Sequence, residues 1–96
     1  MTMQDIFDVR LTRTALKQLK KVPVHVARKL QGWVDAVGHE GLYVVRKIPG
    51  YHDEPLKGNR SGQRSIRLSR SYRAIYTVEK GEIYFVEVIE VNQHDY

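Results

Sequence analysis

The sequence predicts a single α+β domain, in which a twisted, mainly antiparallel sheet carries an N-terminal helical hairpin on one face. Two observations predict this class. Apolar residues recur at helical spacing over residues 15–37, and they alternate with polar residues, as in strands, over much of residues 64–91. The expected order is β-α-α-β-β-β, with the helices covering the sheet. A chain of 96 residues holds one modest core, so we expect residues 1–96 to form one domain.

The first strand is expected over residues 6–11, where Phe7, Val9 and Leu11 alternate with their neighbours. Thr12 or Thr14 is placed to cap a short helix over residues 15–21. Pro23 ends that helix and suits the first turn of the next one. The chain is therefore expected to enter a second helix directly after the first.

The second helix has a clear apolar stripe. Its members recur at spacings of four, three and four residues, and they are Val26, Leu30, Trp33 and Val37. Gly38 follows the stripe and is expected to terminate the helix. Because Trp33 lies on the stripe, we expect it to pack in the core rather than to stack on a ligand.

Residues 41–59 show no sustained period and contain Pro49, Gly50, Pro55 and Gly58, so a connecting loop is expected, with a short extended segment at residues 42–45. Three strands follow, over residues 64–69, 72–79 and 82–91. Lys80-Gly81 predicts a tight hairpin turn between the last two. The last strand is nearly continuous in β-branched and aromatic residues, which is typical of a central, covered strand.

The composition excludes several classes of protein. The chain has no cysteine, and therefore no disulfide framework, thiolate metal site or cysteine nucleophile, which suits a cytoplasmic protein. No apolar run is long enough to span a bilayer, so no membrane partner is expected. His25, His39 and His52 share no metal-ligand spacing, and we expect neither a metal nor another cofactor.

Charge is distributed unevenly along the chain, whose net charge is +5. Residues 57–73 contain no acid and six cations, which are Lys57, Arg60, Arg64, Arg67, Arg70 and Arg73. Such a cluster predicts a phosphate-binding surface, because the planar guanidinium group makes paired contacts with phosphate oxygens. The alternative is a solvated basic face that only keeps the protein soluble. Residues 79–96 are instead acidic, with one lysine among five acids.

A basic groove needs few further groups to cleave RNA. The 2′-hydroxyl of the substrate can serve as the nucleophile, so the protein must supply only a base, an acid and cations. Glu54 directly precedes the basic segment and is a candidate proton acceptor, although an ion pair with a neighbouring cation would also explain it. His94 suits acid–base chemistry near neutral pH. Tyr96 can stack on a base or contact a phosphate. The alternatives for these two residues are an exposed histidine and a frayed terminal residue.

Several motifs carry a resemblance to a known family. They are Glu-Pro-Leu-Lys-Gly-Asn-x-Ser-Gly over residues 54–62, then Arg67, Tyr-Arg-x-x-Tyr over residues 72–76, and His-Asp-Tyr at residues 94–96. In these motifs the chain resembles the RelE/ParE superfamily of bacterial toxins, above all the YoeB branch and its RelE and HigB relatives. Two departures are Asp95, which separates His94 from Tyr96, and Ile66, where the nearest relatives carry a second arginine.

The resemblance implies a RelE-like microbial RNase fold and the activity of an mRNA interferase. Members of the family are toxins of type II toxin–antitoxin systems. They bind the 70S ribosome at its decoding site, cleave mRNA there without a metal or other cofactor, and are neutralised by a cognate antitoxin protein. A basic surface of this kind also suits an acidic antitoxin segment laid across it.

The resemblance also implies a role for individual residues. Glu54 stands at the position of the general base, His94 at that of the general acid, and Tyr96 at that of the terminal tyrosine that orients the substrate or stacks on a base. The cations implied to hold and neutralise the scissile phosphate are Lys57, Arg73 and, in support, Arg67.

Two other functions remain open from the sequence. A ParE-like poison of DNA gyrase belongs to the same superfamily and hydrolyses nothing. Such a protein does not need Glu54, Arg73 and His94, so the presence of all three argues against this function. A non-catalytic module that binds nucleic acid needs only the basic hairpin, and it would bind RNA in a salt-sensitive way without forming a product.

Overall fold

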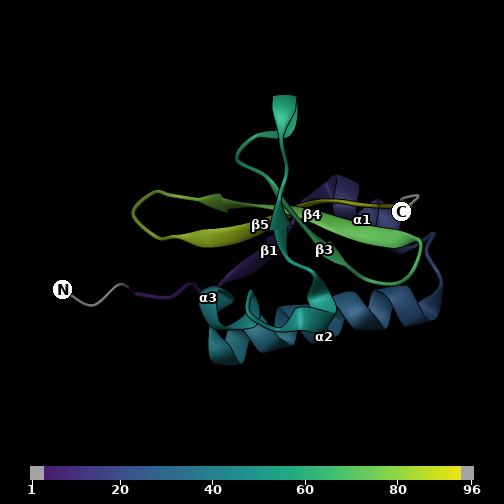
Figure 1. Cartoon of the computed structure of the whole chain (residues 1–96), viewed down its shortest axis with the longest axis horizontal. Helices are drawn as coiled ribbons and strands as arrows, with labels where there is room; N and C mark the ends of the chain where they lie inside the picture. Colours follow the sequence, from purple (N-terminus) through teal and green to yellow (C-terminus); the bar gives the residue numbers. More distant parts are fainter. Residues whose placement is uncertain (1–3, 94–96) are drawn as a thin grey trace.

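The structure is a computed structural model that describes residues 4–93, and it has the expected α+β class. Its five-stranded sheet has the order β1-β5-β4-β3-β2 (Figure 1). The edge strand β1 (Val9–Leu11) runs parallel to β5 (Phe85–Gln93). The other neighbours are antiparallel and are β4 (Tyr72–Glu79), β3 (Arg64–Arg67) and the short β2 (Glu54–Pro55). The sheet is therefore mainly antiparallel, as expected.

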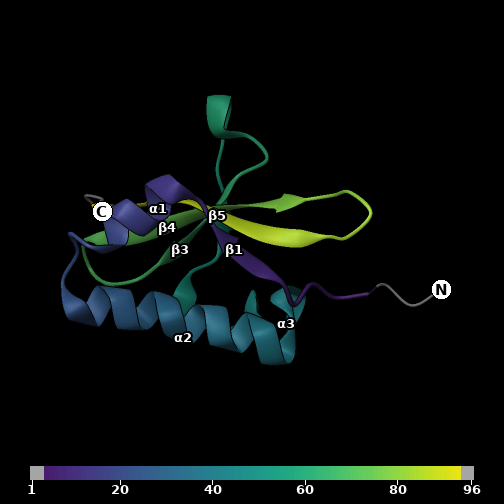
Figure 2. The same cartoon turned by 180° about the vertical axis from the view of Figure 1, so that it is seen from behind.

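Two helices follow β1, namely α1 (Arg13–Leu19) and α2 (Val24–Glu40). Thr12 caps α1, because its hydroxyl accepts the N–H of Ala15 at 3.1 Å. α2 runs along one side of the sheet, whereas the segment between β2 and β3 stands out on the opposite side (Figures 1 and 2). We refer to the sheet face turned away from α2 as the open face. None of the helices in residues 4–93 has the length and apolar character needed to cross a membrane.

The predicted end of the second helix is wrong, since α2 passes through Gly38 and ends at Glu40. The termination signal is Gly41, whose φ of +93° favours glycine, and a side chain there would collide with Asp5. Asp5 accepts the N–H of Tyr43 at 2.8 Å. Residues 42–45 consequently form a helical turn, α3 (Leu42–Val45), rather than the expected extended segment.

Other element bounds also differ from those expected. β1 is limited to three residues, although Ile6 before it is buried. The region expected to be a loop contains two 3₁₀ turns, η1 (Pro49–Tyr51) and η2 (Gly58–Arg60), and the strand β2. The tight Lys80-Gly81 turn is wrong: residues 80–84 form a longer loop that exposes Ile83 and Tyr84. β5 therefore starts at Phe85.

The core confirms the apolar stripe predicted for the second helix. Val26, Leu30, Trp33 and Val37 are all buried in one cluster that also contains Ala15 of α1. The Trp33 ring lies 5.1 Å from that of Tyr76, centroid to centroid. The strand residues of this cluster include Ile66, Ala74, Tyr76, Val86, Val88 and Val91. Both helices thus contribute to the core on one face of the sheet.

A β-bulge in β5 decides which residues reach the open face. Ile75 of β4 pairs with Glu90, whereas the next residue, Tyr76, pairs with Val88, so Ile89 is the extra residue. Without this insertion, strict alternation after Val86 and Val88 would turn Glu90 into the core. The bulge instead directs Glu90 to the open face and returns Val91 to the core.

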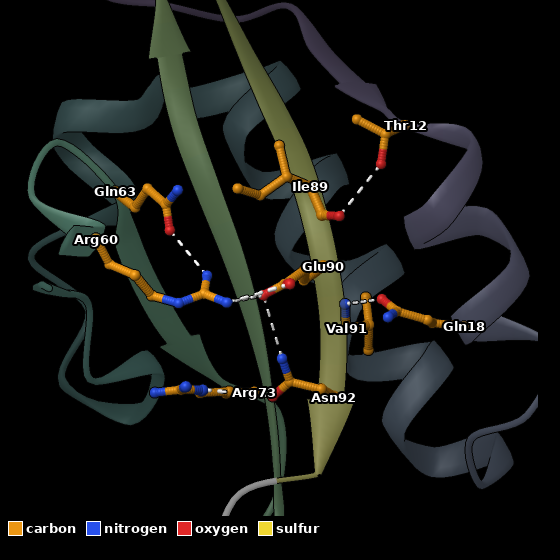
Figure 3. A network of polar contacts seen from close by, with 9 residues as sticks. All are labelled: Thr12, Gln18, Arg60, Gln63, Arg73, Ile89, Glu90, Val91 and Asn92. Atoms are coloured by element: carbon orange, nitrogen blue, oxygen red, sulfur yellow. Dashed lines mark hydrogen bonds and ion pairs between the residues drawn. The ribbon is translucent and has the colours of Figure 1, made fainter.

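α1 completes the edge of β5 beyond the end of β1. The Thr12 hydroxyl donates to the Ile89 carbonyl at 3.3 Å, and the Gln18 side-chain oxygen accepts the Val91 N–H at 2.6 Å (Figure 3). These side chains satisfy backbone groups that β1 is too short to reach. The C-terminal part of β5, which carries Glu90 and Asn92, is consequently fixed from the side.

Candidate nucleic-acid interface

Strand register arranges the side chains of the open face, most of them polar, in two neighbouring rows. The first row crosses four strands and contains Glu54, Ser65, Ile75 and Glu90. The second row lies two residues along the strands and contains Arg67, Arg73 and Asn92. Because residues two apart in a strand point to the same face, the two rows form one surface.

Three of the residues expected from the sequence meet on this surface, namely Glu54, Arg67 and Arg73. Glu54 is exposed, and the two arginines are half-buried. Arg73 lies two strands across and two residues along the sheet from Glu54, which corresponds to about 12 Å between their Cα atoms. Arg67 is on the strand between them, directly opposite Arg73.

Lys57 and Arg70 lie on the two turns that flank this surface. Lys57 is exposed at the start of η2, in the loop between β2 and β3. Gly58 and Gly62 have φ values of +68° and +93°, a backbone conformation that favours glycine in a turn. Arg70 is exposed in the β3–β4 turn, next to the paired Arg67 and Arg73.

Arg60 is engaged with other side chains of the open face. It forms an ion pair with Glu90 at 2.9 Å, and its Nη1 donates to the Gln63 side-chain oxygen at the same distance (Figure 3). The Arg60 and Glu90 side chains are 40% and 28% exposed, so water reaches the pair. Phosphate binding by Arg60 stays a prediction, and the observed contacts give this residue a second, structural use.

Arg64 does not lie with the other arginines of the basic segment. It pairs with Pro55 and Tyr76 on the helix-covered side of the sheet, and its Nε donates to Asp53 at 2.6 Å. Burial alone would lower the pKa of Arg64, but the hydrogen bond to Asp53 and the charge of Asp53 outweigh burial and raise it. Phosphate binding by Arg64 remains a prediction that this placement does not favour.

Asp53 is the centre of a buried polar network. Its side chain is fully buried and accepts a hydrogen bond of 2.5 Å from the Tyr76 hydroxyl, which in turn accepts one from Arg46 at 3.2 Å. Burial and the neighbouring Asp53 raise the pKa of Tyr76. Asp53 directly precedes Glu54, so this network anchors the two-residue strand β2 on the helix-covered side of the sheet. The next side chain, that of Glu54, is thereby directed to the open face.

His94, Tyr96 and the intervening Asp95 lie outside the described residues, so their predicted roles stay predictions. The last described residue, Gln93, pairs with Tyr72, the neighbour of Arg73. The other departure from the family motif has a local explanation, since Ile66 is 1% exposed and belongs to the core.

Sequence reasoning missed Glu90, Asn92 and Gln63 as members of this surface. Asn92 donates to Glu90 and accepts from the Nε of Arg73, both at 3.4 Å. Glu90 was assigned to an acidic end of the chain that would be separate from the basic segment. In the sheet, however, β5 lies directly beside β4, which brings Glu90 among the arginines. The Val-x-Val-x-x-Val spacing at residues 86–91 was the available signal for the bulge.

The grouping of titratable residues does not favour a metal. Within residues 4–93, no group of three or more His, Asp and Glu side chains is arranged to hold a metal ion. On the open face, the exposed carboxylate of Glu54 instead lies one and two strands away from guanidinium groups. This arrangement suits proton transfer beside an anion.

Comparison of the sequence with protein-family models and with curated proteins finds no match. Solved structures do match. The YoeB/ParE toxin from Agrobacterium tumefaciens has a TM-score of 0.67 and 19% identity, over 91% of this chain and 98% of that one. The archaeal RelE–RelB complex from Pyrococcus horikoshii has a TM-score of 0.68 and 21% identity, over 91% and 93%. The YoeB–YefM complex from Staphylococcus aureus has a TM-score of 0.67 and 19% identity, over 92% and 97%.

These likenesses extend over almost the full length of both chains, at identities that establish the fold alone. The protein has the fold of the RelE/YoeB toxin superfamily. The expected RelE-like fold is thereby confirmed, and the predicted activity is argued separately below.

Proposed function

We propose that this protein is the toxin of a type II toxin–antitoxin system and acts as a ribosome-dependent mRNA endonuclease. One observation carries the proposal: Glu54, Arg67 and Arg73 share the open face of a sheet whose fold is that of RelE and YoeB toxins. The family resemblance of the motifs around these residues supports the same activity.

The proposed reaction is a transesterification within the RNA. The Glu54 carboxylate takes the proton of a 2′-hydroxyl, and the 2′ oxygen then attacks the adjacent phosphorus. As the bond from phosphorus to the 5′ oxygen breaks, His94 protonates that oxygen. The products are a 2′,3′-cyclic phosphate and a 5′-hydroxyl end. No step in this sequence requires a metal, since the nucleophile belongs to the substrate.

The cations stabilise charge that develops on the phosphate. Arg73 and Arg67 stand opposite each other on β4 and β3, where both guanidinium groups can approach one phosphate. Lys57 approaches from the β2–β3 loop, and Arg70 is placed to hold a neighbouring phosphate. Tyr96 orients the substrate base. Fixed cations of this kind lower the barrier most when they are positioned before the reaction begins.

The proposed partners are the 70S ribosome, its mRNA and a cognate antitoxin, all in the cytoplasm. Similar structures include complexes of RelE with RelB and of YoeB with YefM. The net charge of +5 and the arginines of the open face suit an acidic antitoxin segment that covers Glu54 and Arg73.

The test is a translation reaction programmed with a defined mRNA, in which primer extension maps the breaks. We expect breaks that require ribosomes, and a loss of roughly 100-fold or more in cleavage rate for Glu54→Gln, Arg73→Ala and His94→Ala. Matched controls are Glu87→Gln, on the same face of the sheet, and Arg28→Ala, exposed on α2; both are expected to cleave like the wild type.

Three outcomes would contradict this proposal. A folded triple variant that still cuts mRNA would exclude the assigned acid–base pair. Uncut mRNA together with inhibited DNA gyrase supercoiling would replace the nuclease by a ParE-like poison. Salt-sensitive RNA binding without a product would leave a binding module.

A further inference from the structure

An ion pair crosses the open face, from the loop between β2 and β3 to strand β5. Arg60 belongs to η2, in the loop between β2 and β3, and its partner Glu90 lies on β5. Figure 3 shows the Arg60 side chain reaching across β4 toward Glu90. The pair therefore links the loop that carries Lys57 to a strand on the far side of β3 and β4.

Two members of the first row are buried, although they lie on the open face. Ser65 and Ile75, the two middle members of the row, are 7% and 0% exposed. Ile75 lies outside the core cluster that the helices cover, so it is buried from the open face. Since Glu90 is the cross-strand neighbour of Ile75, an arginine that reaches Glu90 from the loop passes over this position.

Glu90 also reaches Arg73 through Asn92. The Asn92 side-chain nitrogen donates to Glu90, and its oxygen accepts from the Arg73 Nε. One carboxylate is therefore in contact with the loop of Lys57 on one side and, through an amide, with the guanidinium group of Arg73 on the other. In the proposed reaction, Lys57 and Arg73 are the two cations that hold the scissile phosphate.

We propose that Glu90 is a positioning residue. Through its ion pair with Arg60 it tethers the Lys57 loop to the sheet and fixes the position of that loop, so that Lys57 and Arg73 approach the same phosphate. Arg60 then serves as the counter-ion of Glu90 rather than as a phosphate ligand. This inference rests on the proposed function. It assigns a use to an acid that would otherwise repel RNA from the middle of a basic surface.

Charge reversal distinguishes the two possible roles of Arg60, as the counter-ion of Glu90 or as a phosphate ligand. We expect Arg60→Glu and Glu90→Arg each to lower the single-turnover cleavage rate, on the order of tenfold, because misplaced groups lose reactivity steeply. The combined variant Arg60→Glu plus Glu90→Arg should regain most of the rate. If Arg60 contacts the phosphate itself, the combined variant will stay as defective as Arg60→Glu, and the proposal is overturned.

A double-mutant cycle tests whether Lys57 mediates the effect. Glu90→Ala should lower the cleavage rate in the wild-type background but change it little in a Lys57→Ala background, since the residue it positions is then absent. Equal effects of Glu90→Ala in the two backgrounds would show that Glu90 acts independently of the loop, against the proposal.

Hydrogen exchange on the free protein tests the positioning without any RNA. The Leu56 N–H donates to the Gln63 carbonyl at 2.9 Å, and the Gln63 N–H donates to the Arg60 carbonyl at 3.0 Å. Glu90→Ala should speed exchange of these amides several-fold, whereas the control Glu87→Ala should not. If the wild type cuts no mRNA, the proposed function fails while this readout still decides the positioning: unchanged exchange in Glu90→Ala would overturn it.

Discussion

The two faces of the sheet hold similar ion pairs in different surroundings. On the helix-covered side, Arg64 pairs with Asp53 at 2.6 Å, and the Asp53 side chain is fully buried. On the open face, Arg60 pairs with Glu90 at 2.9 Å, and both side chains retain contact with water. Both pairs tie the segment around β2 to the rest of the sheet. The two carboxylates differ in solvent access. Asp53 is closed to water and fixes the backbone beside it, whereas a ligand or a salt ion can reach Glu90.

The pair on the helix-covered side matters because its carboxylate is fully buried and depends on protein partners for its hydrogen bonds. Asp53 accepts from Arg64 and from the Tyr76 hydroxyl, and its own side chain is fully buried, whereas that of Arg64 is 26% exposed. Loss of the carboxylate would leave a cation and a hydroxyl without their acceptor. The exposed partners can instead return to water, which limits what either one contributes to stability.

The largest difference should therefore appear on removal of each carboxylate. We expect Asp53→Ala to lower the free energy of unfolding by about 3–5 kcal/mol, whereas Glu90→Ala should lower it by less than about 1 kcal/mol. Urea unfolding of the two variants beside the wild type measures both values. Equal losses would mean that burial does not distinguish the pairs, and would break the comparison.

The hydroxyl group of Tyr76 makes the free energy of unfolding depend on pH, which distinguishes the helix-covered side of the sheet from the open face. Burial, together with the charge and hydrogen bond of Asp53, raises its pKa above the value of about 10 expected in the unfolded chain. Above about pH 10, the unfolded chain therefore loses this proton while the native protein keeps it, and the free energy of unfolding falls as pH rises. Below that pH the contribution is present in full.

Replacement of Tyr76 by Phe should remove that part of the alkaline fall. At neutral pH we expect Tyr76→Phe to cost about 1–3 kcal/mol, because Asp53 and Arg46 lose the hydroxyl between them. Burial also raises the pKa of Tyr51, so Tyr51→Phe should likewise reduce the alkaline fall, and it provides a comparison without loss of a contact to Asp53. Parallel stability curves for the wild type and Tyr76→Phe from pH 8 to about pH 11 would contradict the assignment.

The same contrast explains how far the sequence could predict the structure. The stripe from Val26 to Val37 and the strand over residues 72–79 were correct, because a helical period and clean alternation each specify which side chains face the core. The grouping of Glu54, Arg67 and Arg73 could be expected from the family resemblance. The pairing of Arg67 with Arg73 required only that the basic segment form paired strands, whereas Glu54 joins them through β2, in a region that was expected to be a loop.

Strand register and the position of the β-bulge could not be predicted from the sequence in the same way. Residues 83–91 are nearly continuous in apolar side chains, so the change in spacing between Val86, Val88 and Val91 is the one signal of an extra residue, and that spacing does not identify Ile89 as the residue inserted. Arg64 and Arg67 belong to one basic segment, yet they point to opposite faces because they are three positions apart on one strand. Asp53 lies in a polar loop, and the sequence does not indicate that it is buried, because its partners Arg64 and Tyr76 follow 11 and 23 residues later.

The smallest expected effect is also the most specific to the open face. A double-mutant cycle with Arg60→Gln and Glu90→Gln should give a coupling of about 0.2–1 kcal/mol in low salt. Because salt screens exposed charges, this coupling should fall toward zero in about 1 M sodium chloride. The corresponding cycle for Arg64→Gln and Asp53→Asn should keep most of its larger coupling, since counter-ions do not reach a buried carboxylate. A salt-independent Arg60–Glu90 coupling would mean that the pair is shielded like its buried counterpart. RNA could not then approach these two side chains without first opening the loop between β2 and β3.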